Sequence, residues 1–350
     1  SKDASTSAKE TWYVWVKDEA GNVSPNSATI TNFKVTLTAN TGTTLTAKAD
    51  TASGTNVTSG MYVLKGTPVF PTGALVSGYH SLVVKNGSTT ITNGSSQTIN
   101  ADTTFTSSAS ANTVKINIYN NGAAWSNSEI KVTLYNGTTA TTYTATVSSG
   151  SQATLTAVPN GTYNIYAGKT SLAKTTLLDS GVDVTVNNND PTAVTVNYYT
   201  LTVAAGTGIS AVSIGGQSTT LAVQVLYNAT AADRQTIAID ATVKSGYTWS
   251  TWTKTSGTDL VTFTAATKSQ NVMMGAGAAT LTASAPYTVT PTITRNDYNT
   301  FTASATAGSQ YFISTSQTTA PAATATGWST TASKDASTSA KETWYVWVKD

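Results

Sequence analysis

The sequence predicts an all-β protein built as a string of small β-sandwich and β-grasp-like modules. At about 80–100 residues for each module, one 332-residue repeat holds about four. Three observations predict this class. Polar and apolar residues alternate with a period of two along many short segments, as half-buried strands do. Turn-forming Gly, Asn and Ser separate these segments. No segment of helical length carries apolar residues at helical spacing.

An internal repeat is the strongest feature of the chain. Residues 1–18 and residues 333–350 have the same sequence, SKDASTSAKETWYVWVKD, so the period is 332 residues. We interpret the 350 residues as one unit of a tandem repeat followed by an overlap into the next unit. A discrete subunit with duplicated ends is the alternative interpretation.

The composition indicates an extracellular or cell-surface protein and argues against several functions. Only 10% of the residues are charged, and Thr, Ser, Asn and Gly supply the polarity, so surface hydration depends little on salt or pH. The net charge is +2 without a basic cluster, which argues against nucleic-acid binding. No apolar stretch reaches about 20 residues, so we expect no membrane-spanning segment. The absence of cysteine excludes disulfide bonds and thiolate metal sites.

The two ends are predicted to be parts of one kind of module, with residues 286–350 as its first part and residues 1–32 as its last. The segment WYVWVKDEAGNVS resembles the late hairpin of bacterial Ig-like domains. Asp18, Gly21 and Asn22 are typical of the turn. Alternation assigns the preceding side chains to two faces, namely Trp12, Val14 and Val16 on one, and Tyr13, Trp15 and Lys17 on the other.

Residues 33–110 and 199–285 are predicted to be two copies of another module, in which Gly78 aligns with Gly246. Both copies begin with a strand and a Gly turn and later contain Gly-Tyr. The pattern resembles the divergent internalin B-repeat family, small β-grasp-like modules of Gram-positive surface proteins. The second copy also carries Trp249 and Trp252, which the resemblance places in the core, whereas the first copy has no tryptophan there.

Residues 111–198, between these copies, are predicted to form a β-sandwich. The segment LTAVPNGTYNIYA resembles the collagen-adhesin B-type, prealbumin-like sandwich. Its Pro-Asn-Gly, residues 159–161, is typical of a turn, and Tyr163 and Ile165 are expected to point inward from the strand that follows.

That family often carries a spontaneous Lys–Asn isopeptide bond catalysed by a buried acid. The resemblance implies Lys115, on the first strand, and Asn197, on the last, as the pair. Two features argue against the bond. Val114 and Ile116 define one face of the first strand, which puts Lys115 on the other. No Glu lies between residues 130 and 190 to serve as the acid.

The sequence predicts no catalytic residues, no cofactor and no metal site, and hence no enzyme. Its one histidine, His80, is interpreted as a strand or loop residue, and no GxSxG motif accompanies it. Gly168-Lys169-Thr170 lacks the earlier glycine of a phosphate loop. Asp18, Glu19 and Asn22 could ligate Ca²⁺, but a hydrogen-bonded turn is the better interpretation.

The leading functional hypothesis is a structural repeat unit of an extracellular microbial surface fibre or giant adhesin stalk, whose partners are other copies of the repeat. Modules that follow one another without a spacer indicate a stiff or semi-stiff rod. In a variant, the Ig-like end receives a strand from a neighbouring chain. The alternative is an adhesin module that binds glycans or host proteins. If Trp12 and Val14 face a core, an exposed aromatic pair remains to stack on sugars or to pack against a neighbour, namely Tyr13 with Trp15, repeated as Tyr345 with Trp347.

Overall fold

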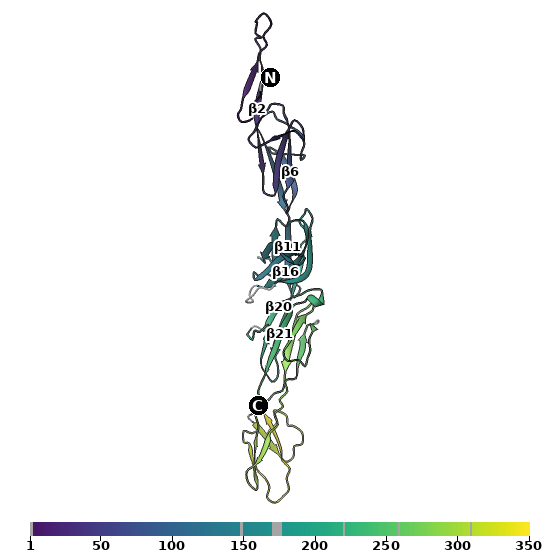
Figure 1. Cartoon of the computed structure of the whole chain (residues 1–350). Helices are drawn as coiled ribbons and strands as arrows, with labels where there is room; N and C mark the ends of the chain where they lie inside the picture. The colour runs from purple at the N-terminus through teal and green to yellow at the C-terminus, as the bar shows by residue number, and fades with distance from the viewer. Residues whose placement is uncertain (1–2, 148–149, 170–176, 220, 258–259, 309) are drawn as a thin grey trace. The chain divides into compact units, whose positions relative to one another are not determined.

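The computed structural model describes residues 3–147, 150–169, 177–219, 221–257, 260–308 and 310–350, without the side chains of residues 260–262 (Figure 1). Within these residues the chain forms β-strands and one short 3₁₀ turn, Ala231–Asp233. The predicted all-β class is therefore confirmed. The chain divides into two compact units. One comprises Ser1–Ile118 with Trp125–Thr195, and the other comprises Tyr119–Ala124 with Val196–Asp350.

The first part of the first unit is a pair of sheets. One sheet has the order β1-β2-β10-β7-β8, and β5 also pairs with β2. Its strands are β1 (Thr11–Val14), β2 (Ala28–Ala39), β10 (Thr103–Ala111), β7 (Tyr79–Asn86), β8 (Thr89–Ile91) and β5 (Tyr62–Leu64). The other sheet consists of β4 (Thr55–Val57), β3 (Thr43–Ala49), β6 (Pro68–Leu75) and β9 (Gln97–Thr98), in that order. Val35, Ile99 and Phe105 are fully buried in the core.

The second part of the first unit follows at once. β11 (Thr113–Asn120) pairs with β15 (Gln152–Thr156). A four-stranded sheet has the order β14 (Thr139–Thr146), β13 (Ile130–Asn136), β16 (Gly161–Lys169) and β17 (Leu178–Val186). The expected inward positions are confirmed, because Tyr163 and Ile165 are both buried. The Tyr163 hydroxyl donates a hydrogen bond to the Pro159 carbonyl oxygen at 3.0 Å, which fixes the predicted turn to its strand.

The second unit repeats the plan of the first sheet pair. The parallel pair β2–β10 has its counterpart in β18–β25, and the antiparallel pair β10–β7 has its counterpart in β25–β22. β20 pairs with β18 as β5 pairs with β2. The strands are β18 (Val194–Ala205, in this unit from Val196), β25 (Ala279–Ser284), β22 (Thr251–Ser256) and β20 (Ala222–Leu226). A short strand, β12 (Ala123–Ala124), pairs with the end of β11.

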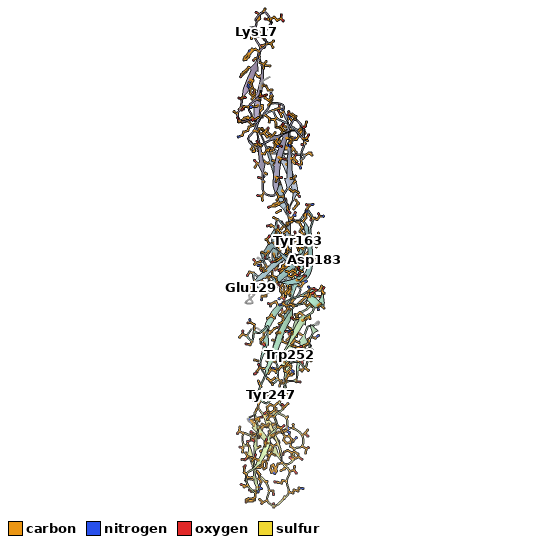
Figure 2. The ribbon with its side chains drawn as sticks, in the orientation of Figure 1. Lys17, Glu129, Tyr163, Asp183, Tyr247 and Trp252 are labelled. Carbon is orange, nitrogen blue, oxygen red and sulfur yellow. The ribbon has the colours of Figure 1, made fainter. Side chains whose placement is uncertain are left out.

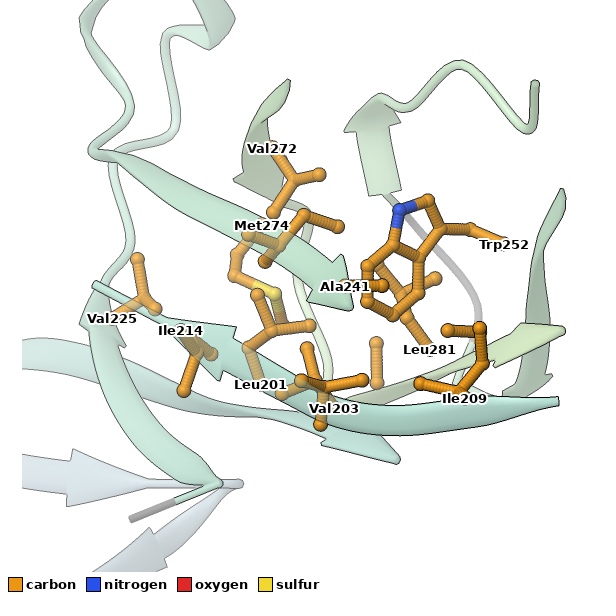
Figure 3. Packing of buried hydrophobic residues seen from close by; sticks show 14 of the residues in the cluster. Leu201, Val203, Ile209, Ile214, Val225, Ala241, Trp252, Val272, Met274 and Leu281 are labelled. Carbon is orange, nitrogen blue, oxygen red and sulfur yellow. The ribbon is translucent and has the colours of Figure 1, made fainter. Parts of the chain in front are cut away.

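A second sheet closes this core with the order β19 (Ile209–Ile214), β21 (Thr236–Val243), β24 (Gln270–Met274) and β23 (Leu260–Thr262). Figure 3 shows Trp252 packed among aliphatic side chains. Trp252 is fully buried, which confirms its predicted core position, and its indole nitrogen donates to the Lys268 carbonyl oxygen. Trp249 is half-buried and packs edge-on against Trp252 with ring centroids 5.7 Å apart.

The last part of the second unit has two small sheets. One has the order β26 (Thr292–Arg295), β27 (Thr300–Ser304) and β29 (Ser333–Asp335), and the other pairs β28 (Gln310–Ser314) with β30 (Tyr345–Lys349). Few apolar side chains are fully covered here; Ala303 and Val348 are the buried ones among the described residues. Across the described chain, no helix has the length and apolarity that a membrane span requires.

Candidate functional site

The joint between the two parts of the first unit is a single buried residue. Asn112 alone separates β10 from β11, and it is fully buried. Its main-chain nitrogen donates to the Gly78 carbonyl oxygen at 2.8 Å, and its side-chain Nδ2 donates to the Val158 carbonyl oxygen at 2.8 Å. Asn112 therefore bonds both parts of the first unit, so bending at this joint breaks buried hydrogen bonds.

Gly78 allows this close approach. Its φ is +91°, and a Cβ there would lie 2.3 Å from the Ala157 carbonyl oxygen. That oxygen belongs to the main chain of the next module and cannot rotate away as a side chain could. Glycine is needed at this position for its backbone conformation and for its lack of a side chain.

The second unit contains the same arrangement. Gly246 has a φ of +83°, and its carbonyl oxygen accepts a hydrogen bond from the Thr288 main-chain nitrogen at 3.0 Å. A Cβ on Gly246 would lie 2.8 Å from both Tyr287 and Val289. The ring of Tyr247 (Figure 2) meets Tyr287 edge-on at 5.0 Å between centroids. In each unit a Gly-Tyr pair thus lies where two parts of the unit meet.

A second glycine supports the tyrosine in each case. A Cβ on Gly42 would lie 2.1 Å from the Tyr79 ring, and a Cβ on Gly208 would lie 2.3 Å from the Tyr247 ring. Both glycines follow a threonine in the first loop of the module. The Gly-Tyr pattern is visible in the sequence as a family resemblance, but its place at the joint is not, because the contacting residues are remote in sequence.

His80 lies at the first joint, at the start of strand β7, as the strand interpretation expects. Its Nε2 atom lies 3.5 Å from Asp190 Oδ1, and its Nδ1 atom is 2.8 Å from Ser81 Oγ. Asp190 Oδ1 also accepts a hydrogen bond from the Thr113 main-chain nitrogen. In a catalytic triad Nε2 faces the serine and Nδ1 the acid, so this arrangement is the reverse. The contact instead connects the two modules.

The N-terminal hairpin, which we define as residues 3–32, carries an exposed apolar surface. Tyr13 and Trp15 are 55% and 53% exposed, with ring centroids 5.8 Å apart. On the opposite face Trp12 is half-buried, whereas Val14 and Val16 are 58% and 71% exposed. The two-face expectation assumed that the valine face packs on a core. In this copy Val14 and Val16 pack on no core. Apolar exposure on this scale is typical of an interaction surface.

The hairpin turn is closed by hydrogen bonds. Both Asp18 carboxylate oxygens accept bonds from Asn22, one from its main chain and one from its side chain, each at 2.7 Å. These bonds, the side-chain bond first, lower the pKa of Asp18. Gly21 has a φ of +95° in the predicted turn, and beside it Lys17, labelled in Figure 2, forms an isolated antiparallel β-bridge with Val23. Among the described residues, no group of three or more His, Asp or Glu side chains is arranged to hold a metal ion.

Asn32 holds together the base of the hairpin. This residue is fully buried, and its Nδ2 donates to the Ser5 and Ala8 carbonyl oxygens. Its Oδ1 accepts from the Glu10 main-chain nitrogen. Strand β2 then runs on without a break from its pairing with β1 into its pairing with β10.

The second copy of the aromatic pair has a different environment. Tyr345 and Trp347 are half-buried on β30, which pairs with β28. Trp347 stands opposite Phe312, with ring centroids 6.4 Å apart. The neighbouring Val348 is 8% exposed.

The residues of the possible isopeptide pair lie in different compact units. Lys115 is exposed between Val114 and Ile116, both fully buried, so the alternation that directs Lys115 away from the core is confirmed. Asn197 is half-buried on β18, and its main-chain oxygen accepts from the Tyr227 nitrogen. The crosslink, against which two features of the sequence argue, stays untested. Of the phosphate-loop-like tripeptide, Gly168 and Lys169 end strand β16, and Thr170 lies outside the described residues.

Comparison with known proteins gives weak structural similarity alone. No protein-family model and no curated protein matches the sequence. The Bacillus anthracis TIE protein is 10% identical, with 78% of this chain and 55% of that chain covered and a TM-score of 0.21. The pilus adhesin SpaC from Lactobacillus rhamnosus GG is 9% identical, with 76% and 45% covered and a TM-score of 0.23.

BcpA, the major pilin subunit of Bacillus cereus, is 9% identical, with 73% of this chain and 99% of that chain covered and a TM-score of 0.15. The chain spans about half the length of the first two proteins. At TM-scores this low, the similarities carry no argument about fold or function.

Proposed function

We propose that the chain is a structural repeat unit of an extracellular microbial surface fibre or giant adhesin stalk, and that it has no catalytic activity. The observation that carries the proposal is how the modules are joined. Asn112 is the only residue between β10 and β11, and β2 belongs at once to the hairpin and to the next module. An array of this kind is stabilised by module cores and nearest-neighbour contacts.

Such joints suit the transmission of force along a chain. Bending at Asn112 breaks buried hydrogen bonds on both of its sides. An enzyme or a freely hinged receptor has no need of this arrangement, whereas a stalk has to keep its modules in register. The identical residues 1–18 and 333–350 support the same function, because they indicate tandem copies.

Surface labelling tests the proposal. An antibody against the peptide of residues 333–350, applied to intact cells and viewed by electron microscopy, should label surface filaments at regular intervals. External protease should remove the label before it damages cytoplasmic proteins. Label confined to the cell interior would exclude a surface fibre.

A second candidate function, binding of glycans or host proteins, is favoured by one observation, the exposed rings of Tyr13 and Trp15. Aromatic rings of this kind can stack on sugars. A Trp15→Ala chain should then lose retention on a glycan array or host-protein surface, whereas Tyr298→Ala, which removes an 82% exposed ring elsewhere, should not. Equal retention of both variants would reject the binding role.

A further inference from the structure

We propose that the exposed face of the N-terminal hairpin docks on residues 292–308 and 310–332 of another copy of the repeat, which we call the acceptor segment. The inference rests on the proposed function, since it requires copies to meet.

The hairpin enters this contact preformed. Two local features of the shared residues recur in both places where they occur. The Ser5 main-chain nitrogen donates to the Glu10 carboxylate, as Ser337 donates to Glu342. The rings of Tyr13 and Trp15 are 5.8 Å apart, and the rings of the second copy, Tyr345 and Trp347, are also 5.8 Å apart. Docking therefore requires little reorganisation of this segment.

The second copy shows what covers the exposed residues. There the acceptor segment supplies β28, whose residues 310–314 pair with Tyr345–Lys349. Val348 stands opposite Tyr311 and is 8% exposed, whereas its equivalent Val16 is 71% exposed. Residues 13–17 of the hairpin have the same sequence as residues 345–349. They therefore carry the same side chains as the strand that pairs with β28.

The strand that would dock uses a different edge from the one already paired in the hairpin. On the hairpin side, the Val16 and Glu10 carbonyl oxygens accept bonds from the Ser24 and Asn32 nitrogens. Main-chain groups of successive residues point to opposite edges of a strand. The main-chain N–H and C=O groups of the even-numbered residues therefore point toward β2. Those of the odd-numbered residues, Trp15 among them, point to the other edge of the strand.

The acceptor segment pairs with that other edge. The Tyr311 main-chain nitrogen and oxygen both bond Ser329, so the main chain of its neighbour Phe312 faces Trp347. Trp347 is the equivalent of Trp15. One strand can thus pair with β2 through its even residues and with β28 through its odd residues, and the docked hairpin completes a continuous sheet.

Matched substitutions in the two copies test the proposal with the full 350-residue chain. In the unaltered chain, residues 345–349 already pair with β28. Because both strands belong to one chain, residues 345–349 compete for β28 at an effective concentration in the millimolar range. We expect this chain to be monomeric at micromolar concentration. Val348→Asp puts a charge at a buried position of β30. We expect β30 to detach, which leaves β28 without its pairing strand. Sedimentation velocity should then show concentration-dependent head-to-tail oligomers.

There are two matched controls. Val16→Asp alone leaves β28 paired with residues 345–349. The double variant, Val16→Asp with Val348→Asp, leaves β28 unpaired but puts a charge on the hairpin that would dock there. Both should stay monomeric. A monomeric Val348→Asp chain, or equal oligomerisation of the double variant, would overturn the proposal. Regular surface labelling alongside either result would leave the proposed function intact, so the two failures are distinguishable.

The register has its own test. Pairs without mutual main-chain bonds, such as Tyr311 opposite Val348, place their Cα atoms about 4.5 Å apart, within disulfide range. The chain has no native cysteine. In the Val348→Asp chain, Val16→Cys with Tyr311→Cys should therefore give interchain disulfides on mild oxidation. Oligomers that form without this crosslink would contradict the proposed register.

Discussion

Replacing Gly78 with alanine removes the contact on which the first joint depends. The new Cβ would lie 2.3 Å from the Ala157 carbonyl oxygen and 2.7 Å from its carbonyl carbon. Neither is the end of a movable side chain. Relief requires the two modules to separate at this edge, and the bond from the Asn112 nitrogen to the Gly78 oxygen is lost.

Gly87 supplies a matched control in the same module. Its φ is +56°, and a Cβ there meets nothing within 4 Å. Alanine in the left-handed region costs about 1–2 kcal/mol at either site. At Gly78 one hydrogen bond of about 1 kcal/mol is also lost, and buried Asn112 groups left without partners cost about 1–3 kcal/mol more. The joint should therefore be weakened by about 2–4 kcal/mol more in Gly78→Ala than in Gly87→Ala.

Hydrogen exchange reads this difference locally, which matters because a chain of several modules does not unfold as one two-state system. At about 1.4 kcal/mol for each tenfold change, the Asn112 amide should exchange about 30- to 1,000-fold faster in Gly78→Ala than in Gly87→Ala. Protection that agrees within about threefold between the two variants would refute the idea that Gly78 holds the joint.

Three further predictions concern the core of the second unit, folding stability at high pH and the base of the hairpin. Trp252→Ala should destabilise the second unit by about 3–5 kcal/mol in denaturant unfolding, whereas Trp15→Ala, at an exposed site, should change stability by less than about 0.5 kcal/mol; equal effects would contradict the assigned burial. Burial raises the pKa of Tyr198. Above about pH 10 the unfolded state therefore loses a proton that the folded state keeps, so stability should fall by about 1.4 kcal/mol per pH unit. Tyr198→Phe should remove that part of the decline in a pH series, and an unchanged slope would refute the assignment. Asn32→Ala should speed exchange of the Glu10 amide, which donates to the Asn32 side chain, by about tenfold or more; unchanged protection would show that Asn32 does not hold the hairpin base.

Local patterns in the sequence were enough to predict much of the fold. Alternation correctly directed Tyr163 and Ile165 inward and Lys115 outward. These positions depend on neighbours close in the chain, where a period of two and a turn residue carry the information. The core position of Trp252 was implied by the family resemblance instead, and its burial agrees with it.

The joints could not be predicted in the same way. The contact between Gly78 and Ala157 spans 79 positions of the sequence, and no local pattern marks it. The hairpin shows a further limit, because alternation identified its two faces but not where the partner of the valine face lies. Val16 and Val348 have identical flanking residues on their N-terminal side and opposite exposure. The difference comes entirely from which strands surround them.

The mass of the native surface material after boiling in detergent tests the central claim most directly. A tandem array of 332-residue units predicts covalent chains far above 36.1 kDa, the mass of the 350-residue chain. Detection with an antibody against residues 333–350 would identify them. A band at or below 36.1 kDa alone would contradict a covalent array of repeats.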